Sequence, residues 1–130
     1  MNELESKNEK PKEGRRFSQE QYDFLKECSE KGEEGIKEWN QWITEPDFNR
    51  DILLEGANLS RANLEGAYLV NAYLRGADLN FAHLEGAYLS GAHLEDTMIT
   101  ELHLEGGFLI DTHLEGSNLG AVYIIGAYLF

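Results

Sequence analysis

The chain has 130 residues, and its 24 acidic side chains outnumber 11 basic ones, giving a net charge of -13. This length suits one domain with one modest core. The single cysteine, Cys28, excludes an intrachain disulfide and a multi-cysteine metal site. The acidity argues against direct nucleic-acid binding, because neutralising phosphates takes clustered lysine and arginine. No apolar run reaches the roughly 18 residues of a membrane helix, and Met1–Arg16 lacks the apolar stretch of a signal peptide. The sequence therefore predicts a cytoplasmic protein without membrane contact.

The first part of the chain divides into two segments. Residues 1–16 are polar with little to bury, which predicts a disordered tail. Residues 17–46 predict a helical segment. Ser18 is the expected N-cap, Gln21 stands three residues later as in a capping box, and Phe17 is placed for a hydrophobic staple.

Two helices are expected within residues 17–46. The first would bury Tyr22, Leu25 and Cys28, which follow one another at steps of three. Gly32 is its expected stop. The second would bury residues 36, 39 and 43, and Pro46 would end it.

Residues 52–130 follow a strict period of five. The residue that recurs is leucine or isoleucine, at positions 54, 59, 64, 69, 74, 79, 84, 89, 94, 99, 104, 109, 114, 119, 124 and 129. A small residue usually stands two positions earlier, most often alanine. Helices have a period of 3.6 and strands a period of 2, so neither element carries this pattern. A period this regular predicts a solenoid.

The runs Ala57-Asn58-Leu59, Ala62-Asn63-Leu64 and Ala77-Asp78-Leu79 resemble those of the pentapeptide repeat family. The resemblance implies an all-β solenoid, a right-handed quadrilateral β-helix. In that fold each pentapeptide forms one side, four make a coil of 20 residues, and the leucine and small residue point inward. Residues 52–130 would then make about four coils, a rod of roughly 19 Å at 4.8 Å per coil, with the helical segment capping the first coil.

A few inward positions depart from the small-residue rule. Leu102 stands where alanine is expected and Gly107 follows at the next such site, which indicates an exchange of volume inside the tube. Thr97, Thr112 and Ser117 are also expected to point inward, where their hydroxyls would need backbone acceptors.

Stacking of residues 20 apart predicts one apolar side, which we call the aromatic side. Its members are Tyr68, Val70, Tyr88, Phe108, Ile110, Tyr128 and Phe130. An exposed apolar strip of this size usually marks an interface. The helices could instead cover it, the stacked rings could simply stiffen the rod, or a foreign protein could bind there. A homodimer could form through this side or through the C-terminal coil.

The coils are also acidic. Residues 51–130 hold 11 acidic and 2 basic side chains. The candidate acidic surface consists of Glu55, Glu65, Glu85, Glu95, Glu105 and Glu115. Nine net charges over roughly 19 Å approach the line density of B-form DNA, about one per 1.7 Å. Some members of the family, including those linked to quinolone resistance, are acidic rods that bind DNA gyrase in place of DNA, so the resemblance implies DNA mimicry as an alternative. Ordinary acidic solubility explains the charge equally well.

All four histidines precede a central leucine, and the 20-residue rule pairs His83 with His103 and His93 with His113. Stacked imidazoles beside Glu85 and Glu105 are of the types that hold a divalent cation. A solvated ladder of repeat-position residues explains the same pattern, so no metal or cofactor is assigned.

No catalytic constellation is found in the sequence. The serines of the repeats have no accompanying His/Asp arrangement, and no phosphate loop is present. Cys28 is expected to pack in a helix stripe. The sequence therefore favours a non-catalytic structural or protein-interaction module. A further alternative is a spacer at the N-terminal end of a larger protein, since Trp39-Asn40-Gln41-Trp42 loosely resembles leaders of bacterial family members.

Overall fold

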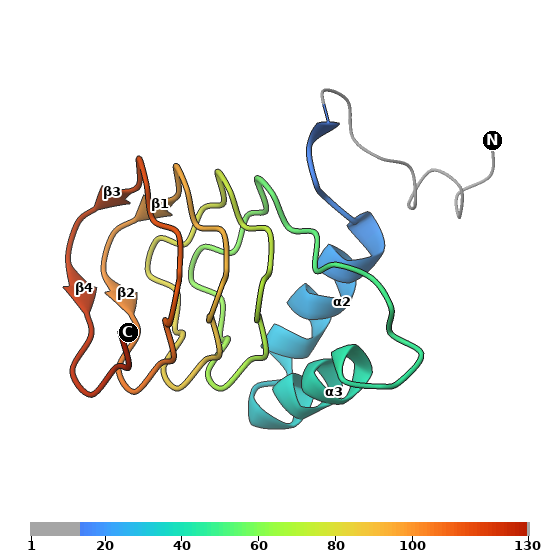
Figure 1. Ribbon diagram of the computed structural model, residues 1–130. Coiled ribbons are helices and arrows are strands. Elements are labelled where there is room, and N and C mark those ends of the chain that lie inside the picture. The colour runs from blue at the N-terminus through green and yellow to red at the C-terminus, as the bar shows by residue number, and fades with distance from the viewer. Residues whose placement is uncertain (1–13, 130) are drawn as a thin grey trace.

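The structure is a computed structural model that describes residues 14–129. Residues 1–13 of the expected tail and Phe130 lie outside the described residues. The tail's last two residues contact the first coil: Arg15 Nε donates to the Glu55 carbonyl at 2.7 Å, and Arg16 N donates to Glu55 Oε1 at 2.8 Å. Two helices stand at one end of a stack of coils, and the coils continue to the C-terminus (Figure 1).

Helix α2, Gln19–Glu30, begins at the expected cap. Ser18 Oγ accepts a hydrogen bond from Gln21 N at 3.2 Å. The rings of Phe17 and Tyr22 lie 5.6 Å apart, as a hydrophobic staple requires. Gln21 does not close a capping box, however, because its side chain is used in the first coil. The helix ends at Glu30, and Lys31 is its C-cap, directly before the expected stop at Gly32.

Helix α3, Glu33–Ile43, packs directly against α2. Gly32, with φ of 70°, turns the chain between the two helices. A Cβ at Gly35 would clash with the Cys28 carbonyl oxygen, so glycine lets the helices approach there. Leu25, Cys28 and Trp39 are fully buried between the helices and the first coil. In the part of the chain that the structure describes, no helix is both long and apolar enough to span a bilayer.

The coils are held by parallel pairing of residues 20 apart. Strand β1 (Met98–Ile99) pairs with β3 (Asn118–Leu119), and β2 (Leu102–His103) pairs with β4 (Val122–Tyr123). Single parallel bridges join Leu53 to Tyr73, Asn58 to Asp78, Asn63 to His83, Tyr68 to Tyr88, Tyr73 to His93, Asp78 to Met98, His83 to His103, Tyr88 to Phe108, His93 to His113 and Phe108 to Tyr128. The five-residue repeat thus builds a parallel β-helix with 20 residues per coil.

Strands stay short because the chain turns after every central leucine. At the first corner Ala57 N donates to the Leu54 carbonyl at 3.0 Å, and Gly56 between them has φ of 71°. A positive φ at the third residue is the signature of a type II turn and favours glycine there. Arg61 and Phe81 occupy the same corner position in successive coils with positive φ, and the Arg61 guanidinium lies 4.6 Å from the Phe81 ring centroid.

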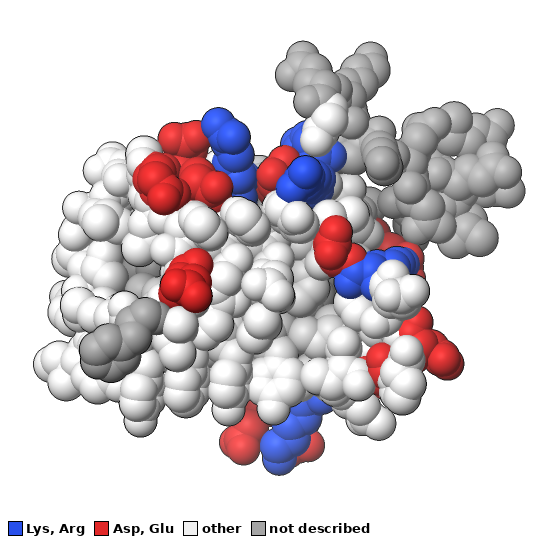
Figure 2. Space-filling view, in the orientation of Figure 1, with Lys and Arg blue, Asp and Glu red and all other residues white. Residues whose placement is uncertain are grey.

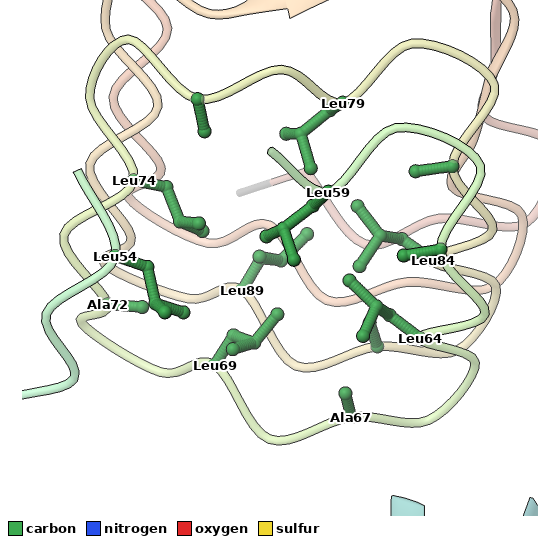
Figure 3. Close-up of a cluster of buried hydrophobic side chains, with 14 of the residues drawn as sticks. Leu54, Leu59, Leu64, Ala67, Leu69, Ala72, Leu74, Leu79, Leu84 and Leu89 are labelled. Carbon is green, nitrogen blue, oxygen red and sulfur yellow. The ribbon is translucent and has the colours of Figure 1, made fainter. Parts of the chain in front are cut away.

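Inside the coils the repeated leucines meet from all sides (Figure 3). Leu54 to Leu94 at each five-residue step are at most 1% exposed. Leu102 and Gly107 are both buried, consistent with the expected exchange of volume. The Thr97 and Thr112 hydroxyls donate to the carbonyls of Leu94 and Leu89, each at 2.9 Å. The hydroxyl of Ser117 also donates to the Leu94 carbonyl.

The helical segment caps the first coil through side chains. Gln21 Nε2 donates to the Asp51 carbonyl at 3.0 Å, while its Oε1 accepts from Leu53 N at 2.7 Å. Asn40 acts in the same way, donating to the Gly66 carbonyl at 3.0 Å and accepting from Tyr68 N at 2.8 Å. Further partners come from hydroxyl and indole groups: Ser29 Oγ accepts from Asn63 N, Tyr22 donates to the Asn58 carbonyl, and Trp39 Nε1 donates to the Tyr68 carbonyl. These groups supply the hydrogen bonds that a preceding coil would have made.

If the helical cap stabilises the first coil, removing the side-chain amide of Gln21 should measurably lower the free energy of unfolding. Gln21→Ala leaves the Asp51 carbonyl and Leu53 N–H without partners, so it should lower the free energy of unfolding by about 1–3 kcal/mol. Gln19→Ala is the matched control, since the Gln19 side chain is half-buried and, among the described residues, its one hydrogen bond goes to Asp23 and not to the first coil. Urea denaturation measures both variants. Equal, small losses in the two would mean that the amide cap contributes nothing.

The loss of stability on replacing an inward leucine by alanine should depend on where along the rod that leucine lies. Leu84 is fully buried, so Leu84→Ala should cost about 2–5 kcal/mol. Leu119 holds the same repeat position but is 55% exposed, so Leu119→Ala should cost less than about 1 kcal/mol. Chemical denaturation of the two variants compares them. Similar losses would show that Leu119 is covered in solution.

Candidate functional site

The aromatic side forms a continuous ladder of rings. Tyr88, Phe108 and Tyr128 stack nearly parallel, with centroids 4.8 Å apart at each step. Tyr68 meets Tyr88 edge-on at 4.6 Å. Beside the rings Val70 is 46% exposed and Ile110 is 41% exposed. The structure thus brings the described candidate interface residues onto one side of the coils; Phe130 lies outside the described residues.

The helices reach only the start of this ladder. Trp39 and Asn40 bond to the backbone of Tyr68, in the first coil. A hollow of about 320 Å³ lies between the segment after α3 and the first coil, and Phe48, Tyr68 and Val70 are among the residues lining it. The helices therefore stand at the end of the rod. Among the described contacts none places them over Tyr88, Phe108 or Tyr128, so the expectation that they might cover the aromatic side is not met.

Two further ladders contain the histidines. His83 and His103 stack at 4.8 Å, and Tyr123 continues the series at 4.7 Å. Tyr73, His93 and His113 stack in the same way at 4.8 Å per step. The pairing of the histidines agrees with the 20-residue rule. We did not predict from the sequence that Tyr73 and Tyr123 belong to these ladders. Applying the 20-residue rule to every residue that precedes a central leucine or isoleucine would have found both.

Each histidine stands two residues before a glutamate that it contacts. Nδ1 lies 3.2 Å from the carboxylate in His83–Glu85, 3.5 Å in His93–Glu95, 3.3 Å in His103–Glu105 and 3.8 Å in His113–Glu115. Although partial desolvation opposes it, hydrogen bonds from the local backbone and from His103 lower the pKa of the Glu105 carboxyl. One ligand atom from each of His83, Glu85 and His103 lies within 4.8 Å of the others.

The candidate acidic residues do not form one free surface. Glu85, Glu95 and Glu105 are half-buried beside their histidines, and Glu55 accepts the Arg16 backbone bond. Glu65 and Glu115 are exposed. Asp96 is paired with Arg75 at 3.2 Å. Figure 2 shows a face on which the coils are largely uncharged, with most charged side chains toward its edges.

Cys28 is placed for packing rather than for chemistry. Its side chain is fully buried. Burial raises the pKa of the Cys28 thiol, and the Glu38 carboxylate raises it further. Since the thiolate is the reactive form, this thiol is a poor nucleophile.

Comparisons with known proteins agree with the repeat pattern. The model of the pentapeptide repeats matches residues 57–96 with eight copies. The comparison with curated proteins returned no match. A pentapeptide repeat protein from the thylakoid lumen of Arabidopsis thaliana is 38% identical, with a TM-score of 0.53 over 58% of this chain and 52% of that one. The chain thus spans about half the length of that relative.

Two cyanobacterial structures also match. HetL of Nostoc, a pentapeptide repeat protein involved in regulating heterocyst differentiation, is 28% identical over 58% of this chain and 37% of its own, with a TM-score of 0.31. Rfr23 of Cyanothece is 26% identical over 67% of this chain and 71% of its own, with a TM-score of 0.23. Residues 57–96 of this chain thus match the model of the pentapeptide repeats, and the Arabidopsis protein to which the chain is similar is itself a pentapeptide repeat protein.

Proposed function

We propose that this protein is a non-catalytic protein-interaction module whose aromatic side binds another protein chain. The observation that carries the proposal is the ladder of Tyr88, Phe108 and Tyr128 beyond the helices, in which the first two rings are half-buried and Tyr128 is exposed. Aromatic side chains contribute large contact areas at low entropic cost and are enriched in the cores of interfaces. Val70 and Ile110 widen the strip on the same side.

The coils suit this role because they hold the rings at fixed spacing. Tyr88 N donates to the Ala67 carbonyl and Phe108 N to the Ala87 carbonyl, each at 2.9 Å. We further propose that residues 52–130 form the right-handed quadrilateral β-helix of about four coils that the family resemblance implies. The 20-residue pairing of the described residues supports this shape. A rigid surface of this kind loses little conformational entropy on binding.

The partner that the surface supports best is a second copy of this chain. A ladder with a regular spacing of 4.8 Å can face its own twin across a two-fold axis, with each ring row packing against the other. Toward the end of the described chain the central residues Leu119, Ile124 and Leu129 are also 43–56% exposed. These central residues add exposed apolar side chains to those of the aromatic side.

DNA mimicry at a type II topoisomerase remains the second hypothesis, and the net charge of the coils is what favours it. The disposition of the acidic groups supports it less. Glu85, Glu95 and Glu105 lie beside histidines, and the coils are not acidic all round (Figure 2). A gyrase supercoiling assay separates the hypotheses, since a DNA mimic should inhibit at micromolar protein. The remaining alternative, a spacer at the N-terminal end of a larger protein, is tested by reading whether the parent gene continues beyond the codon for residue 130.

If the chain self-associates through the aromatic side, adding a charge on that side should lower the mass of the particle in solution. The wild-type chain should elute with the mass of a dimer in light scattering after size exclusion. Phe108→Lys should shift the mass to that of a monomer, because burying an unpaired ammonium costs several kcal/mol. Thr100→Lys adds the same charge on a different side and should leave the dimer intact.

Two outcomes would contradict the proposal. One is a wild-type monomer at every protein concentration tested. The other is an equal loss of mass in Thr100→Lys, which would trace the effect to net charge rather than to the aromatic side. Circular dichroism of both variants checks that the coils remain folded.

A further inference from the structure

The sequence His-Leu-Glu occurs four times, and every histidine of the chain lies in one of these copies. The copies form two stacked pairs. His83 and Glu85 lie one coil from His103 and Glu105, and His93 and Glu95 lie one coil from His113 and Glu115. Each pair gathers two imidazoles and two carboxylates on neighbouring coils. Neither the aromatic side nor the proposed interaction uses these groups.

The pair containing His83 is the more compact of the two. The imidazole centroids of His83 and His103 lie 4.8 Å apart, and the rings are within 7° of parallel. Ligand atoms of His83, Glu85 and His103 all lie within 4.8 Å of one another. The side chains of all three are 29–39% exposed, so a small ion can reach them from solvent.

The backbone under this cluster is fixed on both coils. Leu84 N donates to the His103 carbonyl at 2.8 Å, and His103 N donates to the Ala82 carbonyl at 3.1 Å. Leu84 itself is fully buried. The ligand-bearing residues are therefore held in register, and only side-chain torsions remain to be set when an ion binds.

The carboxylates of the cluster are not fully satisfied. Glu85 Oε1 and Glu105 Oε1 are buried without a hydrogen-bond partner among the described residues. Glu65, Glu85 and Glu105 also follow one another on this side at coil spacing, so like charges are stacked. Stacked carboxylates repel one another, and buried polar atoms without partners are costly. A cation between the coils would relieve both.

We propose that His83, Glu85 and His103 bind a divalent transition-metal ion, with Zn²⁺ as the best match and Glu105 as an available fourth ligand. Imidazole nitrogen and carboxylate oxygen are ligands that zinc takes in proteins, at about 2.0–2.2 Å. Hard cations such as Mg²⁺ and Ca²⁺ prefer all-oxygen sites, which this cluster does not offer. The ligand atoms must move closer together than they stand here, by rotation of half-exposed side chains.

Binding here would tie two neighbouring coils together. His83 and Glu85 belong to one coil and His103 to the next, so one ion would bridge chain segments 20 residues apart. Because an ion held by the folded coils has no equivalent site in the unfolded chain, it should raise the free energy of unfolding, by an amount that grows with the logarithm of the ion concentration relative to Kd.

The second pair provides a control on the same molecule. His93 Nδ1 lies 3.5 Å from Glu95, and His113 Nδ1 lies 3.8 Å from Glu115. Glu95 Oε1 is buried and unpartnered too, but Glu115 is 73% exposed. No group of three ligand atoms within the same distance was found there among the described residues. Loss of His113 should therefore leave the proposed site unchanged.

Calorimetric titration of the full chain with ZnCl₂ at neutral pH tests the proposal. The wild-type chain should bind one zinc ion saturably. His103→Gln and Glu85→Gln should each weaken binding by about tenfold or more. His113→Gln should bind as the wild type does. Zinc should raise the melting temperature of the wild type and of His113→Gln, and raise it little in His103→Gln.

Spectroscopy locates the ion independently of affinity. Imidazole ¹⁵N resonances of His83 and His103 should shift on adding zinc, while those of His93 and His113 stay in place. Circular dichroism of the zinc-free variants establishes that they fold. The proposal is overturned by the absence of saturable binding at millimolar zinc, or by a loss in His113→Gln equal to that in His103→Gln.

Discussion

Parallel hydrogen bonding between residues 20 apart is the constraint on which the rest of this structure depends. Each such bond fixes two things at once. It holds a leucine such as Leu84 inside the tube, and it places the preceding residue outside, directly above its counterpart one coil away. Because the inward volume is shared by all sides of a coil, the sequence must supply one large and one small side chain at every step. The outward residues then inherit the same spacing without any further requirement.

The same constraint creates a problem at the first coil, whose outer edge has no coil before it. Exposed N–H and C=O groups at a sheet edge invite pairing with other chains. The protein meets this with Gln21 and Asn40, since an amide side chain carries one donor and one acceptor group as a peptide does. Helices α2 and α3 position these amides, and the glycine at residue 35 lets the helices pack closely enough to do so.

Features that follow the repeat could be predicted from the sequence, and features that do not follow it could not. Inward positions, the aromatic ladder and the histidine pairs all follow from a repeat of five with a stacking interval of 20, and the structure brings those residues together as that rule requires. The roles of Gln21 and Asn40 could not be foreseen, because their partners lie 26–32 residues away with no periodic signal linking them. The place of the helices was equally hidden. Whether they lay over the aromatic side or across the end depended on bonds of this non-periodic kind, such as that from Trp39 to Tyr68.

A stacked coil also changes the energetics of any group displayed on it. A free chain must lose backbone and side-chain freedom to assemble several ligands or several rings. In the folded coils the backbone freedom is already lost, so the free-energy cost of binding comes only from fixing side-chain torsions and from desolvation. That advantage applies equally to Phe108 on the aromatic side and to His103 beside Glu105. The two surfaces differ in chemistry, not in how they are organised: one offers apolar area to a protein, and the other offers nitrogen and oxygen ligands at a spacing that small rotations can close.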